Sequence, residues 1–121
     1  MHRSILLVDD DPAVRMTLRD LLVEEGFVVH TARDGHHALQ VLEKIDLPDL
    51  ILLDYKMPNM DGRQFLSVQR RIPKLQAIPV VLLSAATREW SGAHLDVDEI
   101  LTKPFDLEVL LSTVNRICAA L

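Results

Sequence analysis

The sequence lacks most features of secreted, membrane-bound and disulfide-stabilised proteins. It has one cysteine, Cys118, which cannot form an internal disulfide and which we interpret as a small buried hydrophobe in a reducing compartment. No apolar run approaches the length of a membrane span, and the run from Ile5 to Val8 is too short for the core of a signal peptide. These absences favour a cytoplasmic protein that neither crosses nor binds a membrane.

An excess of positive charge is also missing. The sequence has 13 Lys and Arg residues against 18 Asp and Glu residues, a formal net charge of −5. A protein that binds DNA or RNA directly would carry a basic patch, so nucleic acid is not an expected partner. No repeat, low-complexity tract or Pro/Gly/Ser-rich linker interrupts the 121 residues. We therefore expect one domain, residues 1–121, around a single core.

Short apolar runs and helical periodicities alternate along the chain. The runs are typical of strands buried on both faces. They are Ile5–Val8, Phe27–Thr31, Leu50–Leu53, Pro79–Leu83 and Glu99–Thr102. Strands that alternate with helices require right-handed crossovers and a mainly parallel sheet covered on both faces. The predicted fold class is therefore α/β, a doubly wound five-stranded parallel sheet in a three-layer α/β/α arrangement.

Four helices follow from apolar residues at helical spacing. The first begins at Pro12 under an Asp11 cap and stops at Gly26, and the last is capped by Asp106. The second has Ala38, Val41, Leu42 and Ile45 on its apolar face, and the third has Phe65, Val68 and Ile72. Between the last two strands, the segment from Thr87 to Asp98 lacks a firm apolar period and has room for one short helix.

Polar side chains follow the carboxyl ends of four predicted strands. Asp9 and Asp10 follow the first strand, Asp54 the third, Ser84 the fourth and Lys103 the fifth. In an open α/β sheet the binding crevice lies outside these carboxyl ends. Three carboxylates brought together repel one another, so either their pKa values rise or a cation neutralises them. Oxygen ligands without a His or Cys partner favour Mg²⁺.

The same residue types indicate phosphoryl chemistry. A carboxylate beside Mg²⁺ can attack a phosphoryl group, and Asp54 is placed for this role. Ser84 offers a hydroxyl and Lys103 a compact positive charge, and both would stabilise the anionic oxygens of the product. Pro104 biases Lys103 toward an extended backbone and permits a cis peptide bond between them.

These residues resemble the receiver domain of two-component response regulators, which sensor histidine kinases phosphorylate. The resemblance covers nearly the whole chain. It rests on Ile5-Leu6-Leu7-Val8-Asp9-Asp10-Asp11, Leu53-Asp54-Tyr55-Lys56-Met57-Pro58-Asn59-Met60-Asp61-Gly62, Leu83-Ser84-Ala85 and Lys103-Pro104-Phe105. It implies a flavodoxin-like strand order of 2-1-3-4-5. It also implies that Asp54 is the phosphoacceptor and that Asp10, Asp54 and the backbone carbonyl of Lys56 hold Mg²⁺. Asp9 would act on this ion largely through water.

The implied function is phosphoacceptor signalling rather than enzymatic turnover. The resemblance implies Mg²⁺-dependent phosphoryl transfer to Asp54 from a phosphohistidine of a sensor histidine kinase or phosphotransfer protein, as in a phosphorelay. Ser84 and Lys103 match the phosphoryl-binding pair of the family. Phosphorylation would switch a surface read by a downstream output protein or domain, and a homodimer is compatible with the sequence. The domain is regulatory, although it takes part in its own phosphorylation and dephosphorylation.

The sequence departs from the family pattern near the fifth strand. Ile100 stands where such receivers have an aromatic residue that reports phosphorylation. Only 19 positions separate Ser84 from Lys103, and Asp96-Val97 replaces the usual Gly-Ala pair. We therefore predict a non-standard output surface and a short or irregular helix before the fifth strand.

Two other functions are alternatives to this one. An aspartyl phosphatase would need a second aspartate two places after the nucleophile, where this chain has Lys56. A pseudo-receiver would act as an interaction module without phosphorylation. The complete set of acidic and phosphoryl-binding residues argues against it, whereas Ile100 and the short segment before the fifth strand keep it as the alternative.

Overall fold

The computed structural model describes residues 3–85 and 97–121. The elements in chain order are β1 (Ser4–Val8), α1 (Pro12–Glu24), β2 (Val28–Ala32), α2 (Gly35–Leu42), β3 (Leu50–Asp54), α3 (Gly62–Arg71), α4 (Pro73–Gln76), β4 (Val80–Ser84), β5 (Glu99–Thr102) and α5 (Leu107–Ala119). Most of the segment from Thr87 to Asp98 lies outside the described residues, and so does the helix expected there. Within the described ranges no helix is long and apolar enough to cross a membrane.

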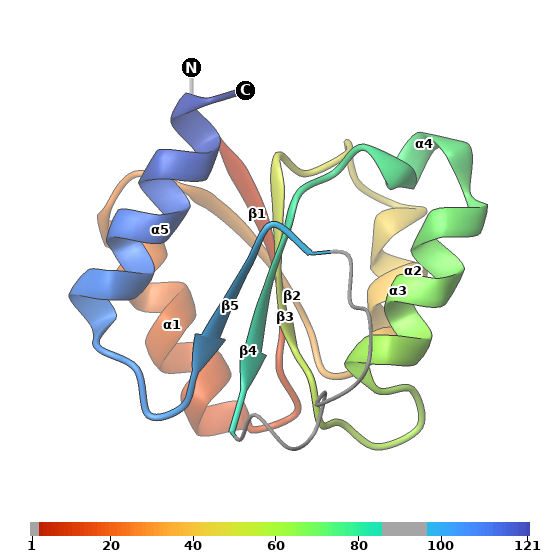
Figure 1. The fold of residues 1–121 in the computed structure, drawn as a ribbon, viewed down its shortest axis with the longest axis horizontal. Coiled ribbons are helices and arrows are strands. Elements are labelled where there is room, and N and C mark those ends of the chain that lie inside the picture. The colour runs from red at the N-terminus through yellow and green to blue at the C-terminus, as the bar shows by residue number, and fades with distance from the viewer. Residues whose placement is uncertain (1–2, 86–96) are drawn as a thin grey trace.

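The five strands form one parallel sheet in the order β2-β1-β3-β4-β5. Helices α1 and α5 cover one face of the sheet, and α2 and α3 cover the other (Figure 1). Both the fold class and the strand order expected from the sequence are confirmed. β2 and β4 each lie one residue later in the chain than their apolar runs indicated.

The core consists of two layers that share the sheet. Side chains alternate along a strand, so Leu6 and Val8 of β1 pack toward α2 and α3, while Ile5 and Leu7 pack toward α1 and α5. All four side chains are fully buried. β3 repeats this alternation, which explains why the strands read as unbroken apolar runs. The rigid sheet therefore fixes the positions of the residues that follow the strand ends.

The predicted caps of the first and last helices are confirmed. The Asp11 carboxylate accepts the backbone N–H groups of Ala13 and Val14 at 2.9 and 3.4 Å, and Pro12 begins α1. Gly26 has a φ of 96°, the left-handed conformation expected after the helix. At α5, the Asp106 carboxylate accepts the N–H of Glu108 at 2.9 Å.

Two helix ends differ from the sequence expectation. α2 ends at Leu42, so Ile45 lies beyond the helix instead of on its apolar face. α3 ends at Arg71, because Ile72 has an extended backbone before Pro73, and proline disfavours the helical conformation in the residue that precedes it. Pro73 then begins the single turn α4, which the apolar pattern did not predict.

Candidate functional site

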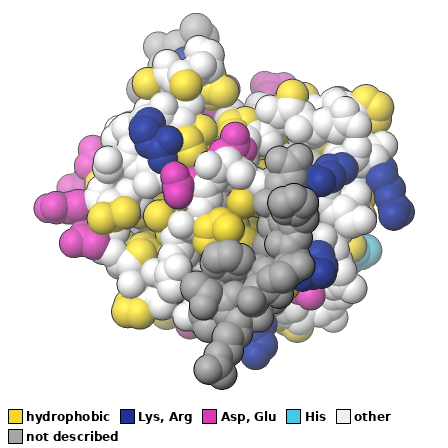
Figure 2. Space-filling model, viewed as in Figure 1, with side chains coloured by type: hydrophobic (Ala, Val, Ile, Leu, Met, Phe, Trp, Pro, Cys, Tyr) yellow, Lys and Arg dark blue, Asp and Glu magenta, His cyan; other side chains and the backbone are white. Residues whose placement is uncertain are grey.

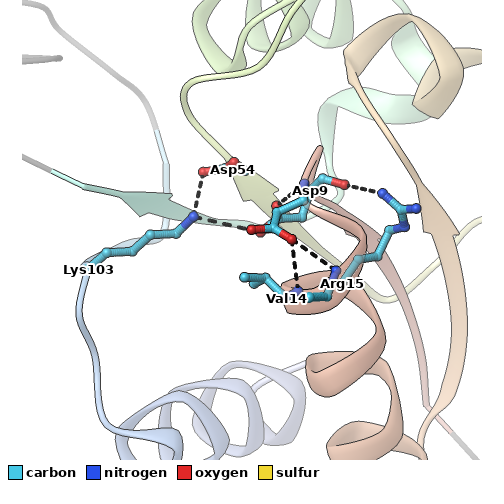
Figure 3. Close-up of polar contacts among 7 residues, drawn as sticks. Asp9, Val14, Arg15, Asp54 and Lys103 are labelled. Carbon is cyan, nitrogen blue, oxygen red and sulfur yellow. Dashed lines mark hydrogen bonds and ion pairs between the residues drawn. The ribbon is translucent and has the colours of Figure 1, made fainter.

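The predicted strand-end residues meet at one edge of the sheet. One carboxylate oxygen from each of Asp9, Asp10 and Asp54 lies within 4.8 Å of the others. The ammonium of Lys103 lies 3.0 Å from Oδ1 of Asp54 and 3.7 Å from Oδ2 of Asp9. Figure 3 shows the three labelled side chains Asp9, Asp54 and Lys103 pointing toward one another. We call Asp9, Asp10, Asp54 and Lys103 the acidic pocket.

The register of the parallel strands produces this convergence. Val8 of β1 lies beside Leu53 of β3, so the residues that follow them, Asp9 and Asp54, emerge together. Asp54 in turn lies beside Leu83 of β4. β5 reaches the same edge, and the backbone N–H of Lys103 donates to the carbonyl of Ser84 at 2.6 Å. The peptide bond between Lys103 and Pro104 is cis.

One ammonium faces three carboxylates, and the titration of the pocket reflects this imbalance. Burial, and then the charge of Asp9, raise the pKa of Asp54 to about 7, although Lys103 acts to lower it. Burial likewise raises the pKa of Asp9. Burial acts to lower the pKa of Lys103, but its hydrogen bond and ion pair with Asp54 outweigh that effect, and the pKa is raised. The carboxylates of Asp9 and Asp54 therefore have too little positive charge near them, whereas the ammonium of Lys103 has more than one negative charge near it.

The donor set fits a divalent cation. Asp9 is fully buried, and within the described part of the chain its Oδ2 has no hydrogen-bond partner, because its ion-pair partner, the ammonium of Lys103, lies 3.7 Å away, beyond hydrogen-bond distance. A buried carboxylate oxygen without a donor is costly unless a positive charge compensates it. Among residues 3–85 and 97–121 this ligand group consists of three carboxylates, a hard oxygen site of the kind that suits Mg²⁺. The residues present thus match the ion expected from the sequence.

The sequence matches one protein family along most of its length. The family model described as response regulator receiver domain matches residues 5–115. This chain belongs to the response regulator receiver family. The receiver fold explains the strand order, and the family is that of regulatory signalling domains in two-component systems.

This chain is also similar to individual proteins and to solved structures. An uncharacterised 14.6 kDa protein of Leptolyngbya boryana is 38% identical over 97% of this chain and 91% of its own length. The response regulator MprA of Mycolicibacterium vanbaalenii is also 38% identical, over 97% of this chain but only 51% of its own length. The crystal structure of the signal receiver domain of a histidine kinase from Syntrophus aciditrophicus superposes with a TM-score of 0.86 at 33% identity, covering 98% of this chain and 92% of that one. The receiver thus spans most of one relative and about half of another.

Ser84 and Lys56 occupy different surroundings in the receiver. Ser84 is fully buried at the end of β4, beside the edge where the acidic pocket lies. Lys56 is exposed on the loop after Asp54, two residues beyond it. The structure therefore brings Asp9, Asp10, Asp54 and Lys103 together directly, and it places the other two predicted residues next to them in the chain or in the sheet.

One contact in the pocket was not foreseen from the sequence. The guanidinium of Arg15 donates to the backbone carbonyl of Asp9 at 2.7 Å (Figure 3). The N–H of Asp11 donates to Oδ1 of Asp9 at 2.9 Å. These bonds fix both the backbone and the carboxylate of Asp9. Nothing in the spacing of Arg15 distinguishes it from Arg19, the other arginine of the first helix.

A groove beside the acidic pocket was also not predicted. It has a volume of about 650 Å³ and lies between α1 and the connection from β5 to α5. Its lining residues are mainly apolar: Ala13, Val14, Thr17, Leu18, Ala85, Lys103, Pro104, Phe105 and Leu107. Because Lys103 belongs to both the groove and the acidic pocket, the groove opens next to Asp54.

On the described part of the face in Figure 2, the Lys and Arg side chains are spaced apart rather than gathered in one patch.

Proposed function

We propose that this receiver accepts a phosphoryl group on Asp54 in a Mg²⁺-dependent reaction and thereby switches a protein-interaction surface. The observation that carries the proposal is the acidic pocket, in which three carboxylates share one ammonium 3.0 Å from Asp54. Such an arrangement is poorly suited to structural stabilisation alone, because burying like charges together is unfavourable. It suits a site that gains a divalent cation and an anionic group.

Each residue of the pocket has a role in this proposal. Oδ of Asp54 attacks phosphorus, the bond between phosphorus and the imidazole nitrogen of the donor phosphohistidine breaks, and the neutral or protonated imidazole leaves. Lys103 and Ser84 stabilise the oxygens of the transferred group. Asp10, Asp54 and the backbone carbonyl of Lys56 would hold Mg²⁺, and Asp9 would contribute through water. Bound Mg²⁺ would supply the positive charge that keeps Asp54 ionised and draws phosphoryl oxygens toward it.

The groove between α1 and the β5–α5 connection supports docking of the phosphodonor. Its apolar lining begins at Lys103 and extends away from the acidic pocket, so a bound helical segment could present a phosphohistidine to Asp54. A sensor histidine kinase or a phosphotransfer protein is the proposed donor, and a downstream output protein or domain is the proposed reader. We also propose that residues 1–121 act as one domain in the cytoplasm.

The proposed readout differs from that of receivers with an aromatic residue on β5. Ile100 is half-buried and packs against the core layer on the α2 and α3 side. Isoleucine has neither a ring to rotate nor a hydroxyl to bond, so the signal is expected to leave the pocket by another route. A chemical-shift map of the phosphorylated protein tests this point. Changes centred on the face around β5 and α5 would contradict it.

Intact mass spectrometry tests the phosphoryl transfer. The protein is incubated with a small phosphodonor, with or without Mg²⁺, next to the Asp54→Asn variant. The expected result is one acid-stable, base-labile phosphoryl group on the parent in the presence of Mg²⁺ and none on the variant. An unmodified parent that still binds Mg²⁺ would instead support a pseudo-receiver, and equal modification of both proteins would exclude Asp54 as the acceptor.

A further inference from the structure

The loop that follows Asp54 is attached to the rest of the molecule at two places. At its near end the N–H of Tyr55 donates to the carbonyl of Leu83 at 2.8 Å, and the N–H of Gly62 donates to the carbonyl of Tyr55 at 2.7 Å. The second attachment lies at Asn59 and Met60, which contact the connection between β2 and α2. No residue of that connection belongs to the acidic pocket, so the second attachment fixes the loop from a side where no pocket residue lies.

The second attachment centres on a buried carboxylate. The side chain of Asp34 is only 4% exposed, although it is charged. Its Oδ1 accepts the N–H of His37 at 2.7 Å, which caps α2. Its Oδ2 accepts Nδ2 of Asn59 at 3.1 Å. Burial acts to raise the pKa of Asp34, but these two hydrogen bonds outweigh it, and the pKa is lowered. One ionised side chain therefore joins the helix to the loop.

The loop needs this support because its backbone is unusual at Asn59. The φ angle of Asn59 is 66°, in the left-handed region that residues other than glycine seldom adopt. The N–H of Met60 donates to the carbonyl of Pro58 at 2.7 Å, so the turn is only three residues wide. Asparagine tolerates this conformation better than most residues, and its amide is also the group that reaches Asp34.

The neighbouring glycine provides independent evidence that the attachment is close. The N–H of Gly35 donates to the carbonyl of Met60 at 3.2 Å. A Cβ atom on Gly35 would lie 2.8 Å from Cγ and 2.9 Å from the carbonyl oxygen of Met60. Only a residue without a side chain permits this approach. Two adjacent residues at the start of α2, the cap Asp34 and the first helical residue Gly35, are thus adapted to two adjacent residues of the loop.

We propose that Asp34 is a positioning residue for the cation site, acting through Asn59 on the loop that carries Lys56. The inference rests on the proposed function, because it assumes that Mg²⁺ binds next to Asp54 and takes the carbonyl of Lys56 as a ligand. Lys56 lies between the two attachments, so the outer one restricts where its carbonyl can go. Mg²⁺ requires near-ideal octahedral geometry, and groups that orient its ligands affect binding strongly.

Magnesium affinity of suitable variants tests the proposal. Asn59→Gly keeps the left-handed backbone without strain but removes the amide that reaches Asp34. It should bind Mg²⁺ about ten-fold more weakly in an NMR titration with MgCl₂ alone. In the absence of Mg²⁺, the amide protons of Gly35 and Met60 should exchange faster with solvent than in the parent. No phosphodonor is needed for either readout.

A charge-conserving double variant and a control sharpen the test. In Asp34→Asn combined with Asn59→Asp, the donor and acceptor exchange places, and the asparagine oxygen still caps α2. This variant should recover most of the lost affinity. Asp49→Asn alters another partly buried carboxylate, which accepts the N–H of Ser4 at 2.8 Å, and it should leave Mg²⁺ affinity unchanged.

The outcomes separate this inference from the proposed function. Parent-like Mg²⁺ affinity in Asn59→Gly, with or without a lower melting temperature, would overturn the positioning role and leave the proposed function intact. Failure of the double variant to recover affinity would also overturn it, since the hydrogen bond would then not be the cause. A parent that binds no Mg²⁺ at Asp10 and Asp54 would overturn both.

Discussion

In the absence of a divalent cation, the folded protein should lose stability as the pH rises through the neutral range, with Asp54 as the main cause. The pKa of this carboxyl is raised from an ordinary value of 3.8 to about 7 by burial and by the charge of Asp9. The folded state therefore holds the Asp54 proton at pH values where the unfolded chain has released it. A raised pKa of this kind favours folding least above pH 7, because the buried group must then carry its charge.

The expected magnitude follows from these two pKa values. The full effect of moving the pKa from 3.8 to about 7 corresponds to roughly 4 kcal/mol. Between pH 5 and pH 8 the free energy of unfolding should fall by about 2.5 kcal/mol. The rest of the effect is already lost below pH 5, where Asp54 of the unfolded chain ionises. Asp9, whose pKa is also raised by burial, contributes in the same direction. This is a large fraction of the stability of an ordinary domain.

Urea unfolding of the parent and of Asp54→Asn at pH 5 and pH 8, in EDTA, measures this loss. The variant keeps the shape of the side chain but cannot ionise, and it shares all other titrating groups with the parent. One of these is His37, whose pKa is lowered by burial and by nearby Arg33. The stability of the parent relative to the variant should fall by about 2.5 kcal/mol from pH 5 to pH 8. Saturating Mg²⁺ should remove most of the difference at pH 8.

Parallel pH profiles for the two proteins would refute this reasoning. They would mean that Asp54 titrates near its ordinary pKa in the folded state, and that the pocket is already neutralised without a cation. The proposed need for Mg²⁺ would then lose its electrostatic basis.

Three further substitutions test separate parts of the structure. Lys103→Met removes the hydrogen bond and charge that lower the pKa of Asp54, so the pKa of Asp54 measured by ¹³C NMR should rise above about 7. A lower pKa of Asp54 in this variant would contradict the ion pair between the two side chains. Gly35→Ala introduces a Cβ atom 2.8 Å from Cγ of Met60, and this clash should reduce the free energy of unfolding by about 1–3 kcal/mol. An unchanged free energy of unfolding would mean that the loop moves away from α2 without cost. Phe65→Ala empties a fully buried site in the layer between the sheet and α3 and should reduce it by about 3–5 kcal/mol in urea, with a loss below 1 kcal/mol indicating that the layer collapses.

Much of the fold was predictable because its determinants are local. Strands buried on both faces must be apolar throughout, and helices must repeat their apolar residues, so the alternation of the two patterns gives the fold class. The site was predictable for a related reason. Parallel strands end at one edge of the sheet, so Asp9, Asp54 and Lys103 were expected at that edge, and the strand order implied by the receiver resemblance made them neighbours.

What the sequence did not reveal depends on contacts between distant segments. Asp34 and Asn59 lie 25 positions apart, and no local pattern pairs them. Arg15 contacts a backbone carbonyl, which leaves no trace in the identity of its partner. The groove beside Lys103 exists because α1 and the β5–α5 connection pack side by side. The single turn α4 after Pro73 was not predicted either, and its Leu75 is almost fully buried in the core, a packing contact that the local pattern does not show.

The central claim is that Asp9, Asp10 and Asp54 gather around a divalent cation next to the phosphoacceptor. Anomalous diffraction from crystals grown with Mn²⁺, which shares the oxygen preference of Mg²⁺, tests it directly. We expect one anomalous peak within bonding distance of the Asp10 and Asp54 carboxylates, from an ion that also has the carbonyl of Lys56 among its ligands. Crystals at saturating Mn²⁺ with no peak between these carboxylates would contradict it.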